Sequence, residues 1–108
     1  MSALFDRIRT LVAAGDRRYS AHAVREIAAD AILIRPLVES IASATVVEEY
    51  PDYHKGPCVL ILQHDEAGRP VHLLWGIPKD SSGPATLVTA YRPKPSQWET
   101  DFVRRRPR

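Results

Sequence analysis

The sequence predicts an α+β fold, with N-terminal helices packed on one face of a four-stranded antiparallel sheet and a short C-terminal helix. Three observations lead to this fold. Apolar residues recur at helical spacing before residue 44, four runs rich in β-forming residues occupy 45–91, and short connections separate those runs. A length of 108 residues is typical of one domain, so we expect a single domain over residues 1–108.

The first two helices are predicted from their caps. Ser2 is a good N-cap for a helix that ends near Gly15, which supplies the left-handed stop. A polar connection at 16–18 leads to Ser20, which is placed to cap a second helix over about 21–29. Each helix is expected to dock through one apolar stripe.

The remaining elements follow from residue type. A third helical segment is expected through about residue 43, and Pro36 fits only in its first turn. The strands are predicted at 45–50, 58–64, 71–77 and 85–91. The second and third should form an antiparallel hairpin, because the connection between them is short and contains glycine.

Those two central strands are apolar almost throughout, so both faces of the sheet centre should be shielded from water. One face is covered by helices. For the other, Ser96 and Glu99 have the spacing of a capping box that opens a short helix, with Trp98 and Phe102 as apolar anchors. A partner chain, either an antitoxin-like protein or a second copy in a homodimer, could cover that face instead.

The composition is typical of a globular protein and excludes several other classes. Apolar residues make up 44% and charged residues 26%, which is ordinary globular usage. No apolar run is long enough to cross a bilayer and the first residues lack a signal peptide's apolar region, so we expect a cytoplasmic protein without membrane contact. The single Cys58 excludes an internal disulfide and fits a reducing compartment.

Basic residues concentrate near the end of the sequence. Residues 92–108 contain six basic and two acidic side chains, a net charge of +4 against +2 for the whole chain. The basic tail at 103–108 includes Arg104, Arg105 and Arg106, which could bind a polyanion such as RNA. The alternative is a solvated tail that keeps the protein soluble.

Motif spacing excludes several chemistries. His54, Cys58, His64 and His72 have intervals that match no standard zinc template, so no metal site is expected. There is no glycine-rich phosphate loop and no nucleophile elbow, and we expect no cofactor.

The polar residues that could carry chemistry each have a structural alternative. His22 lies in the first turn of the second helix, with Arg25 three residues on, and could be a base or only a partner of nearby backbone. His72 interrupts an apolar strand and points either to a covered core or into a pocket. Tyr91 and Arg92 end the last strand, where Tyr91 could simply be a core aromatic. Glu48 and Glu49 alternate faces, so only one can point toward a given site.

Several short motifs together resemble a known family. These are Tyr19–Ser20–Ala21–His22–Ala23, Arg25, Ile32, Leu37, Val47–Glu48–Glu49–Tyr50–Pro51–Asp52, Gly68–Arg69–Pro70–Val71–His72, Thr89–Ala90–Tyr91 and Trp98–Glu99 with Asp101–Phe102. Over residues 19–106 the sequence resembles the small bacterial domain-of-unknown-function family numbered 4258. That family is in turn similar in layout to the RelE-like toxins of toxin–antitoxin systems, which are α+β ribonucleases.

Two functions follow as expectations. The first is a metal-independent endoribonuclease, in which His22 and His72 act as acid and base and Tyr91 orients or donates a proton. Its phosphate-binding residues would be Arg25, Arg92, Arg104, Arg105 and Arg106. The second is a non-catalytic binding module for a protein or nucleic acid, in which the same polar residues form a structural network.

Overall fold

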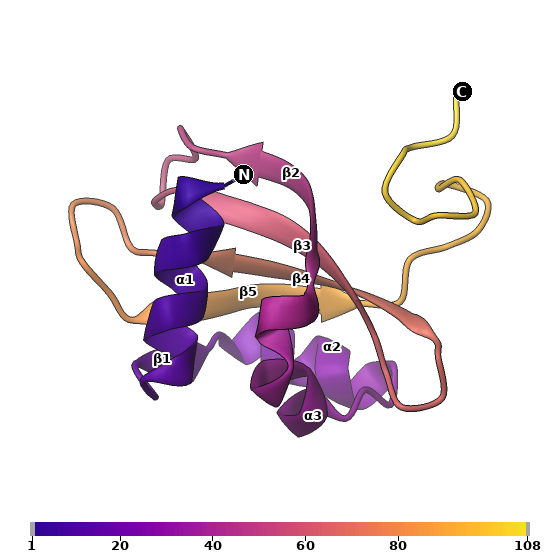
Figure 1. Cartoon of the computed structure of the whole chain (residues 1–108), viewed down its shortest axis with the longest axis horizontal. Helices are drawn as coiled ribbons and strands as arrows, with labels where there is room; N and C mark the ends of the chain where they lie inside the picture. Colours follow the sequence, from indigo (N-terminus) through magenta and orange to yellow (C-terminus); the bar gives the residue numbers. More distant parts are fainter. Residues whose placement is uncertain (1, 108) are drawn as a thin grey trace.

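The computed structural model describes residues 2–107, which form an α+β fold around a five-stranded mixed sheet (Figure 1). The helices and strands have the following bounds: α1 Ala3–Ala13, β1 Arg17–Tyr19, α2 Ala21–Ala29, α3 Ile34–Glu39, the 3-10 turn η1 Ile41–Ser43, β2 Thr45–Tyr50, β3 Cys58–His64, β4 Pro70–Gly76 and β5 Ala85–Tyr91. The predicted helices and the four long strands are therefore present, with the third helix shorter than expected.

The sheet differs from the prediction in its first strand. Strands β2 to β5 form an antiparallel meander, and β1 pairs with β5 in parallel, in the order β1-β5-β4-β3-β2. The predicted four-stranded antiparallel sheet is thus wrong. The three residues of β1 are polar or exposed and show no alternation of burial, so they carry no strand signal of their own. They become a strand because the edge of β5 supplies hydrogen-bonding partners.

One face of the sheet carries the core. Register places Val59 opposite Trp75 and Ile61 opposite Leu73, so these side chains share a face. Helices α1 and α3 cover this face with the following buried residues: Phe5, Ile8, Val12, Leu37 and Val38. Trp75 is 0% exposed at the centre of this layer.

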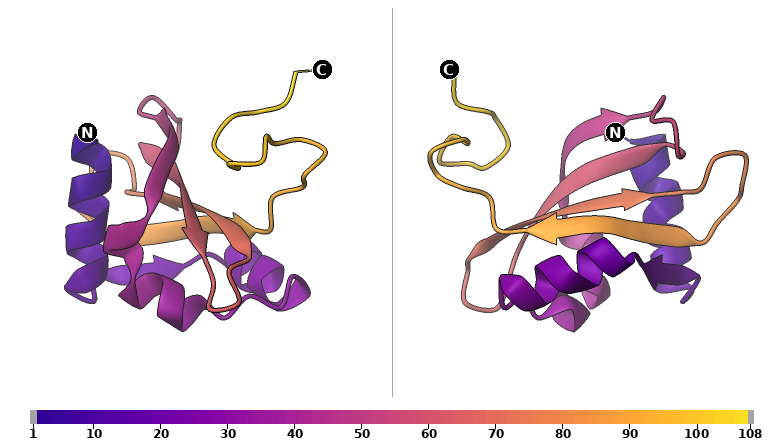
Figure 2. Two further views of the ribbon diagram at one scale, coloured as in Figure 1. Left: turned by 45° about the vertical axis from the view of Figure 1, so that its right-hand side comes forward. Right: turned by 180° about the vertical axis from the view of Figure 1, so that it is seen from behind.

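Helix α2 lies along β5 beyond the end of the short strand β1 (Figure 2). Ser20 fixes this position, because its hydroxyl accepts a hydrogen bond from the Ala23 amide and donates to the Val88 carbonyl. Ala23 is buried in the same core that α1 and α3 cover. The helix therefore protects part of the β5 edge that β1 leaves free.

The segment 93–107 lies over the second face of the sheet and is not helical, so the predicted C-terminal helix is wrong (Figures 1 and 2). Its chain folds back on itself, with a bridge between Trp98 and Arg105 and hydrogen bonds from Glu99 to the Arg104 carbonyl and from Arg106 to the Gln97 carbonyl. The Asp101 carboxylate in this segment accepts hydrogen bonds from the backbone amides of Val103 and Arg104. Such bonds from a side chain to nearby backbone compete with the backbone hydrogen bonds of a helix.

Among the helices of residues 2–107, none combines the length and the apolar character needed to span a bilayer.

Candidate functional site

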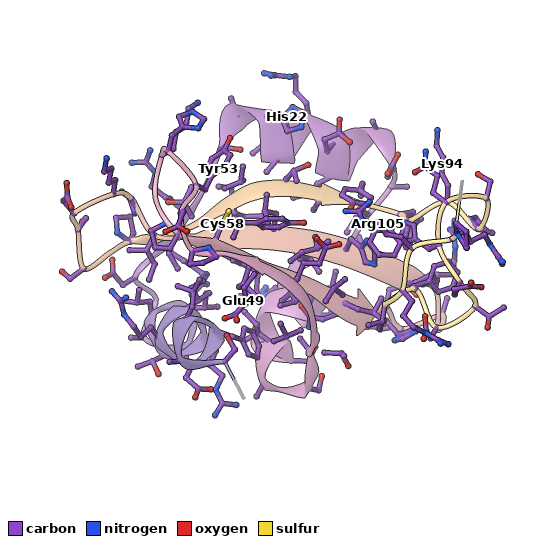
Figure 3. All side chains as sticks on the ribbon, turned by 90° about the horizontal axis from the view of Figure 1, so that it is seen from above. His22, Glu49, Tyr53, Cys58, Lys94 and Arg105 are labelled. Atoms are coloured by element: carbon purple, nitrogen blue, oxygen red, sulfur yellow. The ribbon has the colours of Figure 1, made fainter. Side chains whose placement is uncertain are left out.

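The second sheet face carries two adjoining clefts, one between the loop 51–57 and the segment 93–107 and the other between the same loop and strands β1 and β5. Figure 3 shows Tyr53 and Arg105 at two ends of this face. One, of about 300 Å³, is lined by Tyr50, Tyr91 and Arg105 among others. The second, of about 330 Å³, runs on toward Arg18 and Lys55, and Tyr53 and Cys58 line both. We call the two together the open-face groove.

Sheet register explains the floor of the groove. Leu60 pairs with Leu74, and Leu74 pairs with Thr89, so the three side chains lie on the face opposite the core. Cys58 is buried beside them, and burial raises the pKa of its thiol, which keeps the sulfur protonated. The floor is therefore mostly apolar with an unreactive thiol, and the charged groups of the groove come from its rim.

The loop 51–57 presents Tyr53 at the wall between the two clefts. This loop is anchored by hydrogen bonds from Ile77 to the Pro57 carbonyl and from Lys79 to the Lys55 carbonyl, both 3.0 Å. Gly56 permits the close approach, since its φ is +129° and an added Cβ would lie 2.0 Å from the Ile77 carbonyl oxygen. Tyr53 is nevertheless 42% exposed.

At the other end of the groove, Tyr91 is held by His72. The His72 side chain is 0% exposed, and its Nε2 lies 2.7 Å from the Phe102 carbonyl oxygen. A carbonyl oxygen only accepts, so Nε2 carries the proton and the neutral Nδ1 accepts from the Tyr91 hydroxyl at 3.2 Å. Burial is the main cause that lowers the pKa of His72. The ring also meets Trp98 edge to face, with centroids 4.5 Å apart.

A second network at this end involves Glu48. Arg105 donates from Nε to the Glu48 carboxylate at 2.9 Å, and the Tyr50 hydroxyl donates to the other oxygen at 2.9 Å. The Arg105 guanidinium also lies over the Trp98 ring, 4.5 Å from its centroid. Burial is the largest cause that raises the pKa of both Tyr50 and Tyr91, so both phenols stay protonated at neutral pH.

The structure brings together three of the residues that the sequence singled out: His72, Tyr91 and Arg105. It does not bring His22 to them. The His22 side chain is 57% exposed on α2 and faces Glu26 at 3.9 Å, whereas His72 is sealed from water. Figure 3 places His22 on the helix beside the strands and away from Arg105. Arg25 is likewise exposed on α2.

The other predicted phosphate-binding arginines are engaged with the protein. Arg92 donates to the Asp65 carboxylate at 2.9 Å and, through its amide and Nε, to Asp30. Arg104 pairs with Asp101 at 2.9 Å, and Arg106 pairs with Glu99 at 3.0 Å. These contacts fix the chain that follows β5. Arg92 does not line the open-face groove.

The sequence analysis missed Arg18, Tyr50, Tyr53 and Lys55 as groove residues. Arg18 belongs to β1, whose residues carry no strand signal of their own. Tyr50 lies on the same side of β2 as Glu48, a residue that the sequence analysis did consider. A signal for Tyr53 and Lys55 was present, because an aromatic residue, an imidazole and a cation follow one another between Pro51 and Pro57. Such a loop is a common position for binding residues.

Within residues 2–107, no group of three His, Cys, Asp or Glu side chains is arranged so that it could hold a metal ion.

Comparison with protein families matches residues 19–92 to the family described as "Domain of unknown function (DUF4258)". Neither curated proteins nor solved structures give a match. The comparisons thus offer no support for a likeness to RelE-like toxins. Residues 93–107, which cover part of the second face, follow the matched stretch. Because that stretch spans more than half of the 108 residues, the chain belongs to this family of unknown function, DUF4258.

Proposed function

We propose that this chain is a non-catalytic binding module that binds nucleic acid in the open-face groove. The observation that carries the proposal is the charge of the lining. Arg18 and Lys55 border the groove together with Arg105, whose guanidinium is paired with Glu48 behind the rim, and the lining among residues 2–107 includes no carboxylate. A cationic rim around an aromatic and apolar floor complements a chain of phosphates that bears stackable bases.

The titratable groups at the groove favour binding over catalysis. Cleavage of RNA requires a base that removes a proton from the 2′-hydroxyl. Tyr50 and Tyr91 line the groove, but their raised pKa values make them poor bases at neutral pH. His72 is 0% exposed, with both ring nitrogens hydrogen-bonded, so it acts as a structural partner of Tyr91 and Phe102.

The test is the salt dependence of RNA binding, followed by fluorescence anisotropy of a labelled single-stranded RNA. The variant Arg18→Ala with Lys55→Ala should bind more weakly than wild type. Its slope of log affinity against log salt should be shallower by about 0.7 for each cation lost. Arg35→Ala is the matched control, since Arg35 is 90% exposed and contacts Glu39 on α3. Equal slopes for both variants and wild type, or no RNA binding by wild type, would contradict the proposal.

A metal-independent endoribonuclease is a second candidate function, favoured by the network of Glu48, Arg105 and Tyr50 at the end of the groove. If a bound phosphate drew Arg105 away from Glu48, the freed carboxylate could serve as the base and Arg105 could stabilise charge on the phosphate. RNA incubated with the protein in excess EDTA tests it. Cleavage that Glu48→Gln abolishes and His22→Ala leaves unchanged would establish this activity. Intact RNA that remains bound in the groove would exclude it in favour of the binding module.

A further inference from the structure

We infer that the open-face groove selects single-stranded over duplex nucleic acid, because one unpaired base stacks on Tyr53. This inference rests on the proposed function and adds to it the form of the strand and the residue that recognises it.

Tyr53 is suited to stacking by its exposure and by its support. Its side chain is 42% exposed, and it borders both halves of the groove. Its ring packs against the His54 ring, with centroids 4.6 Å apart, which leaves part of the phenol available to a ligand. An aromatic surface held in place offers stacking at a small cost in conformational entropy.

The backbone beneath Tyr53 is fixed. The Gly56 amide donates to the Tyr53 carbonyl at 2.9 Å, which closes the turn that carries the side chain. The loop is then bound on its far side to Ile77 and Lys79 of the β4–β5 connection. A ligand therefore meets a preformed platform.

Cations lie on both sides of this platform. Arg18 and Lys55 line the half of the groove on one side, and Arg105, which is paired with Glu48 but 58% exposed, lines the half on the other. A strand that crosses Tyr53 can place phosphates near a cation before and after the stacked base. In a duplex the faces of the bases are covered by their stacked neighbours, so only a single strand can make this contact.

The experiment measures anisotropy of three labelled probes of equal length: oligouridine, oligodeoxyuridine and a blunt duplex RNA. Wild type should bind both single strands at least tenfold more tightly than the duplex. Tyr53→Ala should weaken oligouridine binding by roughly tenfold, and Tyr53→Trp should retain it. Oligodeoxyuridine bound as tightly as oligouridine means that stacking and phosphates suffice, whereas a preference for oligouridine adds recognition of the 2′-hydroxyl, the one group in which the two strands differ.

The matched control is Tyr19→Ala. Tyr19 is 37% exposed, comes from β1 outside the groove lining, and contacts Trp75 on the core side. Circular dichroism verifies that each variant is folded. The Tyr53→Trp variant supplies a second readout, because Trp75 and Trp98 are 0% and 2% exposed and only the new indole is open to quenching by a stacked base.

Failure of this inference can be told apart from failure of the proposed function. Equal affinity for duplex and single strand, with the dependence on Arg18 and Lys55 intact, would overturn single-strand selection and leave nucleic-acid binding in place. A Tyr53→Ala loss no larger than that of Tyr19→Ala, or an unquenched indole in Tyr53→Trp, would do the same. Absence of any binding by wild type would overturn both.

Discussion

The Nε2 atom of His72 lies 2.7 Å from the carbonyl oxygen of Phe102, a residue thirty positions later in the chain. This contact joins β4, in the middle of the sheet, to the segment 93–107 that covers part of its second face. The same ring accepts a hydrogen bond from Tyr91 on β5. An imidazole that sequence reasoning placed in catalysis thus joins three parts of the fold, and its burial has measurable consequences.

Replacement of His72 by alanine should destabilise the protein by about 2–4 kcal/mol, because it leaves a cavity and removes the partner of the Phe102 carbonyl. The free energy of unfolding is measured by urea titration. His22→Ala is the matched control and should change it by less than about 0.5 kcal/mol, since that ring is exposed. Similar losses for the two variants would show that the His72 contacts do not stabilise the fold.

Acidification should destabilise the protein through protonation of His72. Burial first, and then the charge of Arg105, lower the pKa of His72 below its ordinary 6.5, while the hydrogen bond to Phe102 partly opposes them. The unfolded chain therefore takes up a proton before the folded one does, and stability falls as pH drops below about 6.5, down to the folded-state pKa. Urea unfolding at about pH 7.5 and about pH 5.5 should give a larger loss for wild type than for His72→Gln. Parallel losses in the two proteins would assign the pH dependence to other groups.

Arg92→Ala should destabilise the fold by about 1–3 kcal/mol, because the Arg92 side chain is 16% exposed and holds both Asp30 and Asp65. Arg25→Ala, which removes an exposed arginine from α2, should have little effect on the midpoint of thermal unfolding. RNA binding by folded Arg92→Ala should match wild type, since Arg92 does not line the groove. A selective loss of RNA affinity would return Arg92 to the role that the sequence analysis gave it.

Gly56→Ala should be strongly destabilising. A methyl group there would lie 2.0 Å from the Ile77 carbonyl oxygen and 2.6 Å from the Lys79 amide nitrogen, so the loop that carries Tyr53 would have to shift. Gly68→Ala is the control: its φ is also positive, at +80°, but nothing lies within 4 Å of an added Cβ, and it should cost about 1 kcal/mol. Thermal unfolding compares the two, and an equal cost would mean that the loop accommodates the methyl group.

The elements that sequence alone could predict are those with strong local signals. The caps at Ser2 and Ser20 place α1 and α2, and the apolar runs at 58–64 and 85–91 give β3 and β5 at their observed bounds. Two features were missed for the same reason. Strand β1 and the path of the segment 93–107 depend on partners far along the chain, so no local pattern specifies them.

The candidate site was predictable only in part. The sequence indicated His72, Tyr91 and Arg105, and the structure brings them to one end of the groove. It could not indicate that His72 would be sealed, since alternation along a strand gives the face of a side chain but not what covers that face. Tyr53 was missed although its residue type and neighbours carried a signal, because the face it borders depends on how its loop packs against the residues after β4.

By itself the sequence determined the α+β class, the two capped helices, the four long strands and the membership in DUF4258, because periodicity, capping and family motifs are properties of short stretches of chain. Only the tertiary structure decided which polar residues are buried and which border a groove. Burial depends on contacts between residues far apart in sequence, such as His72 with Phe102, and these form only when the whole sheet and its covering segment are assembled.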